Sequence, residues 1–472
     1  MVFNSIEFVV FLPIVVLLFY LLPQKARWLM LLAASCVFYM WFVPKYILIL
    51  LVTIVIDYSA GILMEKYADE PRKKKPFLIV SIVSTLLVLF IFKYLGFLND
   101  SVVALCQSLG LNLNTSVKLI LPIGLSFHTF QSMSYVIEVY RGNQKAERHF
   151  GYYALYVMFF PQLVTGPIER PGNLLRQLHE YKEFRYENIS KGARLVLYGL
   201  FIKMVVADHL GAGVDEVYAD PSNYNSWSVM LAMVFYSFQI YCDFFGYSTI
   251  ALGAAKLMGF DISDNFRTPY LSKNIAEFWH RWHISLSTWF RDYVYFPLGG
   301  SRVKFGRWAF NIMVVFVLSG IWHGANWTFL FWGFAHGLLH IVEKVLRNRF
   351  PVKEMRRKWL NVGLDVLRVA KTFVLVTLFW VMFRATDFTN MRDVFVAAVS
   401  NFGGGQQLSV APSVWLYLGM FILSDLLLFN NRFDTWCEDR PVVLRWIIYA
   451  VLVFLVIACS SVNSFPFIYF QF

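Results

Sequence analysis

Long runs of apolar residues recur along the whole chain of 472 residues, and they constrain its fold more than any other feature. An apolar run of about 17–25 residues can cross a bilayer as a helix, which satisfies its backbone groups internally. The predicted crossings number twelve and lie near 5–23, 28–43, 46–63, 77–95, 119–137, 193–210, 227–250, 308–324, 326–342, 369–383, 412–428 and 446–463. The composition agrees, because 58% of the residues are hydrophobic and 15% are charged, against about 45–50% and about 25% in soluble domains. We therefore expect an all-α polytopic membrane protein that forms a single domain over residues 1–472.

Two further apolar stretches, 150–168 and 284–300, are interrupted by Pro and Gly. Irregular backbone at membrane depth is tolerated only where it is buried in protein or lines a water-filled cavity. We therefore expect both stretches to be re-entrant or interfacial segments beside the twelve crossings.

The distribution of Lys and Arg predicts an orientation. These residues gather in the loops at 65–76 and 343–358, whereas the stretch 211–226, predicted to be a loop, is acidic and has neither. Because cytoplasmic loops carry the excess of Lys and Arg, the first two are expected inside and the third outside. Both termini then lie outside, provided that 150–168 re-enters without crossing. Membrane anchoring also accounts for the net charge of +12, so no nucleic-acid partner is expected.

The motifs of several enzyme classes are missing from the sequence. It has no Gly-rich phosphate loop, no G-x-S-x-G elbow and no paired glycosidase carboxylates. The five cysteines are far apart and form no C-x-x-C, so no redox or zinc role is expected. His280 and His283 share a helical face with Glu277, but zinc requires three or four ligands. A packed interfacial helix is the better interpretation, and no metal is predicted.

Ionisable side chains inside the predicted spans are functional candidates, because they are costly in lipid and usually line the interior of a bundle. A proton-coupled transporter would need carboxylates such as Asp57 and Asp243, whereas the plainer interpretation gives each an ordinary polar or basic partner. The histidines in apolar runs are His128, His323, His336 and His340. The last two are four residues apart, which favours interhelical hydrogen bonding over a metal site.

His323 lies where two spans meet with almost no loop, and Gly320 and Gly324 permit a break there. A neutral imidazole that such a break points into a cavity is suited to take a proton from a hydroxyl that attacks a carbonyl. The alternative is a histidine that only hydrogen-bonds a neighbouring helix. Similarly, the mostly aromatic residues 465–472 fit either an interfacial belt or a nucleophile presented at Tyr469.

Several long motifs, in the same order, resemble the membrane-bound O-acyltransferase (MBOAT) family and its alginate O-acetylation branch. They are FFPQLVTGPIER at 159–170, EFWHRWHISLSTW at 277–289, YFPLGG at 295–300 and W-H-G at 322–324. The likeness runs from the first span to the last residue. It implies the MBOAT fold around a central funnel, and an O-acetyltransferase that serves a cell-envelope polysaccharide outside the membrane.

The resemblance also implies roles for particular residues. His323 matches the family's catalytic histidine in W-H-G, and His283 matches a second functional position in R-W-H, while no role is carried onto His280. The terminal FIYFQF is similar to an aromatic motif of envelope-acylation systems whose tyrosine is proposed to carry the acyl group, so Tyr469 is the expected relay. The residues expected to line the funnel are Trp322, Asn326 and His336.

The implied donor substrate is acetyl-CoA, with no cofactor, and the implied partners are a periplasmic or extracellular SGNH-type acetyltransferase and an alginate-type polysaccharide. The implied location is the inner (cytoplasmic) membrane of a bacterium, crossed many times. The alternatives are O-acetylation of peptidoglycan, cellulose or a secondary wall polymer, and D-alanyl transfer to teichoic acid. A proton-coupled transporter would instead require Asp57 and Asp243 and leave His323 dispensable, and a non-catalytic scaffold would tolerate each of these substitutions.

Overall fold

The computed structural model describes residues 1–117, 119–164, 166–350, 358–459 and 467–468. All regular elements in these residues are helices, and the β-type contact found among them is an isolated bridge between Tyr224 and Gln406. The prediction of an all-α chain is therefore confirmed.

Eight helical stretches in the described residues are long and apolar enough to cross a membrane. They are Pro44–Lys66, Pro71–Ser108, Tyr186–Ala219, Ser226–Leu257, Phe305–His323, Trp327–Arg349, Trp359–Arg384 and Val442–Cys459. The other four predicted crossings are helices of 16 or 17 residues, namely α1 (Ile6–Leu21), α2 (Gln24–Met40), α6 (Leu125–Arg141) and α19 (Pro412–Leu428). The chain is thus a multi-pass membrane protein, while the count of twelve crossings stays a prediction.

Two boundaries differ from the prediction for a local reason. The stretch 211–226 was predicted as a loop, but it is helical as far as Ala219. Helix α11 (Asp208–Ala219) continues through polar residues beyond the end of the predicted span 193–210. In the opposite direction, α6 begins only at Leu125, although the apolar run begins near residue 119. Gly124 adopts a left-handed φ of 78° there, a conformation that glycine reaches without steric cost and that does not continue into a helix.

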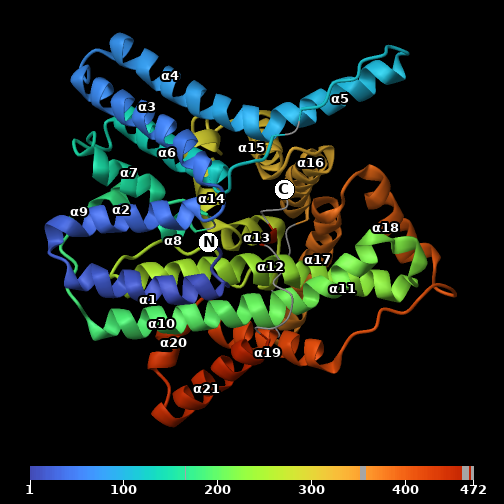
Figure 1. The fold of residues 1–472 in the computed structure, drawn as a ribbon. Helices are drawn as coiled ribbons and strands as arrows, with labels where there is room; N and C mark the ends of the chain where they lie inside the picture. The colour runs from blue at the N-terminus through green and yellow to red at the C-terminus, as the bar shows by residue number, and fades with distance from the viewer. Residues whose placement is uncertain (118, 165, 351–357, 460–466, 469–472) are drawn as a thin grey trace. The chain divides into compact units, whose positions relative to one another are not determined.

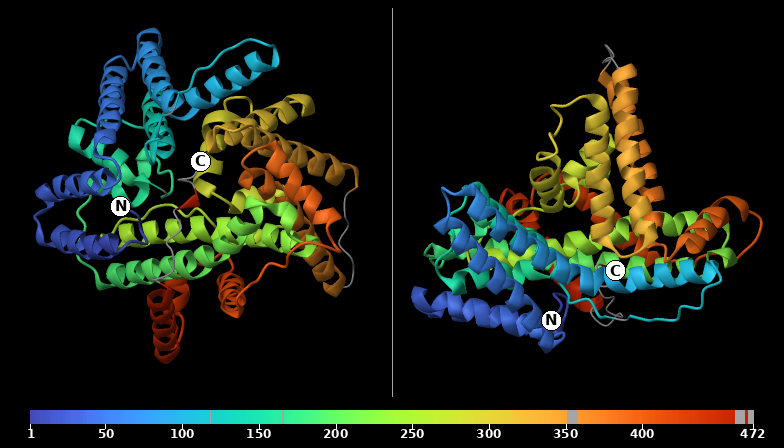
Figure 2. Two further views of the ribbon diagram at one scale, coloured as in Figure 1. Left: turned by 45° about the vertical axis from the view of Figure 1, so that its right-hand side comes forward. Right: turned by 90° about the horizontal axis from the view of Figure 1, so that it is seen from above.

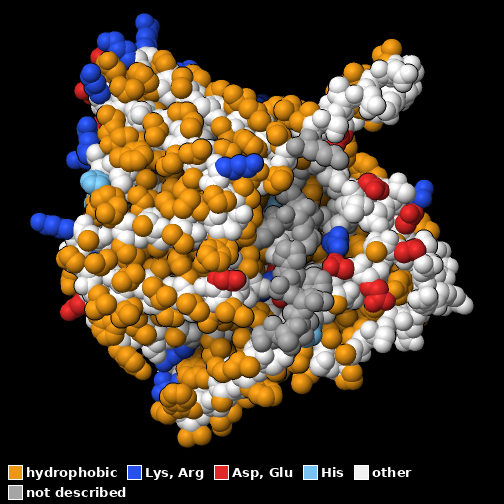
Figure 3. All heavy atoms as spheres, viewed as in Figure 1, with side chains coloured by type: hydrophobic (Ala, Val, Ile, Leu, Met, Phe, Trp, Pro, Cys, Tyr) orange, Lys and Arg blue, Asp and Glu red, His pale blue; other side chains and the backbone are white. Residues whose placement is uncertain are grey.

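The chain divides into two compact units, Met1–Val196 with Tyr247–Ser263 and Leu197–Gly246 with Asp264–Phe472. The first unit holds α1, α2, η1 (Pro44–Tyr46), α3 (Ile47–Lys66), α4 (Pro71–Leu89), η2 (Phe90–Tyr94), α5 (Leu95–Ser108), α6, α7 (Phe150–Met158), α8 (Phe160–Leu163) and α9 (Pro171–His179). Within it, α3 and α4 run side by side and α6 packs on both (Figure 1). Hydrophobic side chains cover the face of this pair seen in Figure 3, and Lys and Arg gather at its turn, as expected of a membrane hairpin.

The second unit begins at the end of α10 (Tyr186–Leu200) and takes in the first two thirds of α12 (Ser226–Leu257). Its other elements are η3 (Phe201–Ala207), α11 (Asp208–Ala219), η4 (Pro221–Asn223), η5 (Pro269–Leu271), α13 (Ile275–Arg281), α14 (Ile284–Phe290), η6 (Arg291–Tyr295), α15 (Phe305–His323), α16 (Trp327–Arg349), α17 (Lys358–Arg384), α18 (Phe388–Ser400), α19, α20 (Phe433–Glu438) and α21 (Val442–Cys459). Of the 18-residue apolar segment of α12, 72% is buried, whereas the figure for the corresponding segment of α21 is 11%. α12 is therefore a core helix and α21 a peripheral one.

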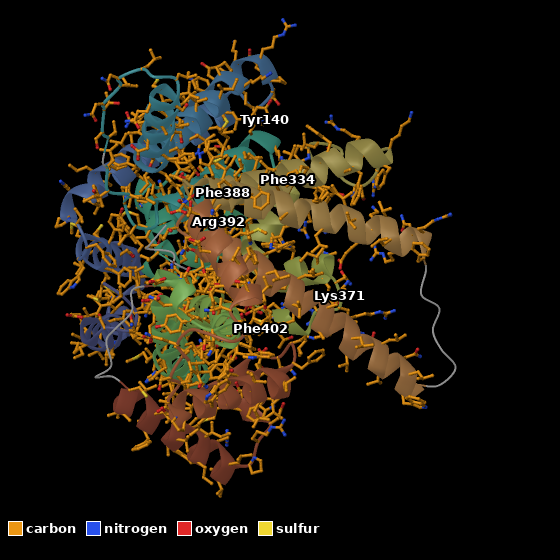
Figure 4. All side chains as sticks on the ribbon, turned by 90° about the vertical axis from the view of Figure 1, so that its right-hand side faces the viewer. Tyr140, Phe334, Lys371, Phe388, Arg392 and Phe402 are labelled. Atoms are coloured by element: carbon orange, nitrogen blue, oxygen red, sulfur yellow. The ribbon has the colours of Figure 1, made fainter. Side chains whose placement is uncertain are left out.

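Three long helices of the second unit carry much of the site. α15 and α16 run side by side over most of their length (Figure 2). α17 packs on α16, and Lys371, labelled in Figure 4, places its Nζ 2.6 Å from Oε1 of Glu343 on α16. The Lys371–Glu343 ion pair therefore ties the middle of α17 to the last part of α16.

Both interrupted stretches are short, broken helices, as their Pro and Gly residues predict. In 150–168 the chain breaks between α7 and α8 at Phe159, and residues 153–164 are all buried in protein. In 284–300, α14 passes into η6 and then into a turn that contains Gly299 and Gly300. The burial around the first break is what irregular backbone at membrane depth requires.

Candidate active site

The break at His323 is built by two helix ends and one polar cap. α15 ends at His323 and α16 begins at Trp327, where the Asn326 side chain accepts a hydrogen bond from the Thr328 amide at 3.1 Å. Asn326 Nδ2 also donates to the Thr386 carbonyl at 2.6 Å. Asn326 therefore fixes the start of α16 and ties it to the end of α17, and both polar atoms of its side chain are engaged in doing so.

Glycines bring α15 and α16 into backbone contact just before the break. A Cβ on Gly320 would lie 2.4 Å from the Phe329 carbonyl oxygen, and its neighbour across the helix pair is Gly333. Small residues allow membrane helices to approach this closely. The sequence predicted the break, and the structure adds that the same glycines fix the distance between the two helices.

The His323 side chain is 3% exposed and lies in an aromatic enclosure. Its ring meets the rings of Trp322, Trp332 and Phe383 edge to face, with centroids 4.9, 5.1 and 5.2 Å away. Trp332 comes from α16 and Phe383 from α17, so three helices hold this imidazole. A neutral imidazole is the form that a general base needs.

His283 lies at the sharp turn between α13 and α14 and is fully buried. It is one of the non-glycine residues with a positive φ, 43°, which marks local backbone strain. Asn265 holds the turn, because its carbonyl accepts from the Ile284 amide at 2.9 Å and its Oδ1 accepts from the Ser285 hydroxyl at 2.6 Å. Burial lowers the pKa of His283 to about 3, so its imidazole is neutral at physiological pH.

Trp322 joins the two histidines that the resemblance singled out. Its ring centroid lies 4.9 Å from that of His323 and 6.0 Å from that of His283. His336 follows on the other side, because the Trp332 ring contacts both His323 and His336. The structure therefore brings together four of the predicted site residues: His283, Trp322, His323 and His336.

His336 also has a hydrogen-bonded partner of its own. Its Nδ1 accepts from Trp279 Nε1 at 3.3 Å, and its ring lies 5.1 Å from that of Trp279. The bond joins α16 to α13, as expected of a histidine that hydrogen-bonds between helices. His336 thus orients Trp279 beside the site.

A cavity of about 370 Å³ opens beside this cluster, between α13, α14, η6, α15 and α16. Its walls are mostly apolar, but five basic or imidazole side chains stand along it: His280, Arg291, His340, Lys344 and Arg347. On α15 it extends as far as Ser319, one turn before His323. His323, Trp322, Asn326 and His336 do not line this cavity, so the expectation that the last three line a funnel stays a prediction.

The described residues contain no group of three or more His, Cys, Asp or Glu side chains that could hold a metal ion. His280 lines the cavity, whereas His283 is buried against Phe244 and Trp322. These two histidines were grouped by their helical spacing, but the chain turns between them at Trp282, where α13 ends.

Tyr469 lies outside the described residues, but the two residues before it are described and buried. Phe467 is fully buried, with its ring 5.7 Å from that of Phe244, and the Phe244 ring lies 4.6 Å from the His283 imidazole. The Ile468 amide donates to Asp243 Oδ2 at 2.7 Å. The chain therefore enters the neighbourhood of His283 immediately before the predicted relay residue.

Both buried carboxylates of the sequence prediction have partners. Ser81 donates to Asp57 Oδ1 at 2.5 Å, and the Thr85 hydroxyl lies 3.4 Å from both oxygens. Asp243 is paired with Lys203, whose Nζ lies 2.5 Å away. The plainer interpretation was therefore right for both, because Asp57 has polar partners and Asp243 a basic one.

Sequence reasoning missed Lys203 and Asp208, which form one buried group with Asp243. A signal was available, since both are ionisable residues inside the predicted span 193–210. Phe244 was also missed, and a single phenylalanine among 47 carries no such signal.

The chain resembles known proteins over most of its length. The membrane-bound O-acyltransferase family model matches residues 147–383, which include His283 and His323. The chain is 37% identical to the probable alginate O-acetylase AlgI of Azotobacter vinelandii, over 85% of this chain and 79% of the relative. It is 34% identical to AlgI of Pseudomonas putida over 100% of both chains. It is also 32% identical to the peptidoglycan O-acetyltransferase of Helicobacter pylori, over 84% of this chain and 80% of the relative.

These matches span both compact units and contain the enclosed histidines, the strained turn and the helix break. The chain therefore belongs to the membrane-bound O-acyltransferase family and is a multi-pass membrane O-acyltransferase.

Proposed function

We propose that this enzyme transfers an acetyl group from cytosolic acetyl-CoA across the membrane for O-acetylation of an alginate-type polysaccharide outside the cell. The observation that carries the proposal is the pairing of His323 and His283 on either side of Trp322, inside a chain of this family. The relatives named alginate O-acetylase supply the polymer class.

The cavity between α13 and α16 suits the donor. Arg291, Lys344 and Arg347 offer positive charge to the phosphates of acetyl-CoA, and the apolar walls suit its extended pantetheine arm. The end of the cavity at Ser319 directs a thioester toward the turn of α15 that carries His323. No cofactor is required, because the thioester already activates the acyl group.

In the chemical step, His323 removes the proton from the Tyr469 hydroxyl as its oxygen attacks the thioester carbonyl. The new carbon–oxygen bond forms, the carbon–sulfur bond breaks, and the CoA thiolate takes the proton from the imidazolium. General-base catalysis of this kind contributes roughly 10²–10⁴-fold. Neutral His283 hydrogen-bonds the donor and is not a cation in this step, since its pKa is about 3.

The acetyl-tyrosine is then the substrate for a second enzyme. We propose a periplasmic or extracellular SGNH-type acetyltransferase, which moves the acetyl group from Tyr469 to a sugar hydroxyl. This division of labour places the protein in the inner membrane of a bacterium, with the basic loops in the cytoplasm and both termini outside.

The test is polymer acetylation in cells. Strains lacking the native protein receive the wild type, His323→Ala or His179→Ala, and ester groups are measured on the purified exopolysaccharide and on peptidoglycan. His179 is the matched control, because it is exposed and paired with Glu147 in the first unit. We expect His323→Ala to abolish polysaccharide acetylation at an unchanged protein level, and His179→Ala to preserve it.

Full acetylation with His323→Ala would overturn the mechanism. Loss of esters from peptidoglycan alone would support the second candidate, peptidoglycan O-acetylation, which the Helicobacter pylori relative favours.

A further inference from the structure

A buried ion group stands where η3 meets α11. Lys203 Nζ lies 2.6 Å from Asp208 Oδ1, although the two residues are five positions apart. An α-helix would place residues at this spacing about 140° apart, whereas the wider π-helical turn of η3 brings them onto one face. The irregular segment therefore creates the ion pair.

The same lysine reaches across to α12. Its Nζ lies 2.5 Å from Asp243 Oδ1, and the three side chains are 2–6% exposed. The close crossing depends on Gly246, because a Cβ there would lie 2.9 Å from the Gly199 carbonyl and 3.0 Å from the Lys203 amide. One ammonium group is thus enclosed between two carboxylates in the core of the second unit.

The second oxygen of Asp243 binds the end of the chain. Oδ2 accepts the Ile468 main-chain N–H at 2.7 Å, and Ile468 is 3% exposed. The next residue on α12, Phe244, contacts the Phe467 ring. Two consecutive residues of α12 therefore hold two consecutive residues of the C-terminal tail.

The Ile468 amide provides a hydrogen bond that the buried Asp243 carboxylate requires. A buried carboxylate requires hydrogen bonds as well as a counter-ion, because its remaining lone pairs have lost water. Lys203 serves one oxygen of Asp243, and the tail amide serves the other. Within the described residues, Lys203 and the tail amide together give a partner to each oxygen of Asp243, so docking and ion pairing stabilise each other.

We propose that Asp243, oriented by Lys203, is a positioning residue that clamps the C-terminal tail through the Ile468 amide, immediately before the following residue of the sequence. The inference rests on the proposed function only in giving that following residue, Tyr469, its role as acyl carrier. The clamp itself is made of described residues, and it lies one side chain, Phe244, away from His283.

A proline tests the clamp by removing a single N–H. Ile468→Pro deletes the donor and keeps Lys203, Asp208 and Asp243, while Ile468→Ala loses the same side chain and keeps the donor. The full-length protein in detergent is treated with a carboxypeptidase, and the release of C-terminal residues is followed by mass spectrometry. A hydrogen bond to a charged group is worth enough to change the docked fraction by about tenfold or more. We expect at least that much faster release from Ile468→Pro than from Ile468→Ala.

A second pair of variants acts from the other side of the bond. Asp243→Ala removes the acceptor, and Asp208→Asn alters the lysine's other partner without touching the tail. Asp243→Ala should speed tail release to the level of Ile468→Pro, and Asp208→Asn should release it several-fold more slowly than Asp243→Ala. Equal release from Ile468→Pro and Ile468→Ala, or from the two aspartate variants, would overturn the clamp.

Acetyl transfer separates a positioning role from a merely structural one. With labelled acetyl-CoA, Ile468→Pro should lower the rate of Tyr469 acetylation by about tenfold relative to Ile468→Ala, with the KM for acetyl-CoA unchanged. A raised KM with unchanged maximal rate would contradict positioning. If the wild type never labels Tyr469 while tail release still depends on Asp243, the relay fails and the clamp stands.

Discussion

His128 and His323 look alike in the sequence, since each is a histidine in an apolar run, and both are almost fully buried, at 1% and 3% exposure. Their surroundings differ. His128 Nε2 lies 2.6 Å from the Thr53 hydroxyl of a neighbouring helix, whereas aromatic rings from three helices surround His323. The comparison teaches that burial alone does not separate these two histidines, whereas the side chains around them do.

The two buried aspartates differ in the same way. Asp57 in the first unit is surrounded by hydroxyl groups, while Asp243 in the second has a lysine and the amide of the chain end. Hydroxyl partners join helices, and such bonds contribute modestly in membranes. The Lys203–Asp243 ion pair also binds the C-terminal tail, so it does more than join two helices.

The largest expected effect is on catalysis. His323→Ala should lower the rate of CoA release from acetyl-CoA by roughly 10²–10⁴-fold, because the general base is lost. His128→Ala should lower it only in proportion to the amount of folded protein. The measurement is CoA release by the purified variants, normalised to monodisperse protein. Equal losses of the CoA-release rate in the two variants would contradict a catalytic role that only His323 has.

Next in size is the stability of the ion group. Lys203→Met leaves two carboxylates buried without their cation, so the free energy of unfolding should fall by about 3–5 kcal/mol. The double variant Lys203→Met/Asp243→Asn removes one of those charges and should recover part of the loss. Thermal unfolding in detergent measures both, and an unchanged midpoint for Lys203→Met would show that the group is not stabilising.

A smaller effect is expected from pH at the strained turn. Burial lowers the pKa of His283 to about 3, below its ordinary value of 6.5, so the unfolded state binds the proton first as pH falls. Its contribution to stability is complete well above pH 6.5 and should fall by about 1.5 kcal/mol between pH 6.5 and pH 5. His283→Asn, which also tolerates a positive φ, should remove that slope. Unfolding midpoints at the two pH values test this, and parallel curves would contradict it.

The smallest effect is expected at Asp57. Asp57→Asn keeps an acceptor for Ser81 and Thr85, so the stability should change by about 1 kcal/mol or less, the size of hydrogen bonds between membrane helices. The same thermal assay applies. A loss as large as that of Lys203→Met would mean that Asp57 bears a charge as consequential as that of Asp243.

The all-α polytopic fold was predictable, because long apolar runs leave a membrane chain few choices. So was the break at His323, from Gly320 and its neighbours. The side chains that contact His323 were not predictable. Trp332 and Phe383 come from helices whose positions relative to α15 cannot be derived from the periodicity of apolar residues. The Lys203–Asp208 pair was not predictable either, because it depends on a π-helical turn that leaves no mark in the apolar pattern, although both residues are ionisable groups inside a predicted span. Motif resemblance singled out His283, whose turn geometry no pattern of burial predicts.

The most direct test of the central claim is mass spectrometry of the C-terminal peptide after purified protein is incubated with isotope-labelled acetyl-CoA. The wild type is compared with His323→Ala and Tyr469→Phe. We predict label on Tyr469 in the wild type and none in either variant. Release of CoA without label on Tyr469 would contradict the relay, and label on Tyr469 at the wild-type rate in His323→Ala would contradict the assignment of His323 as the general base.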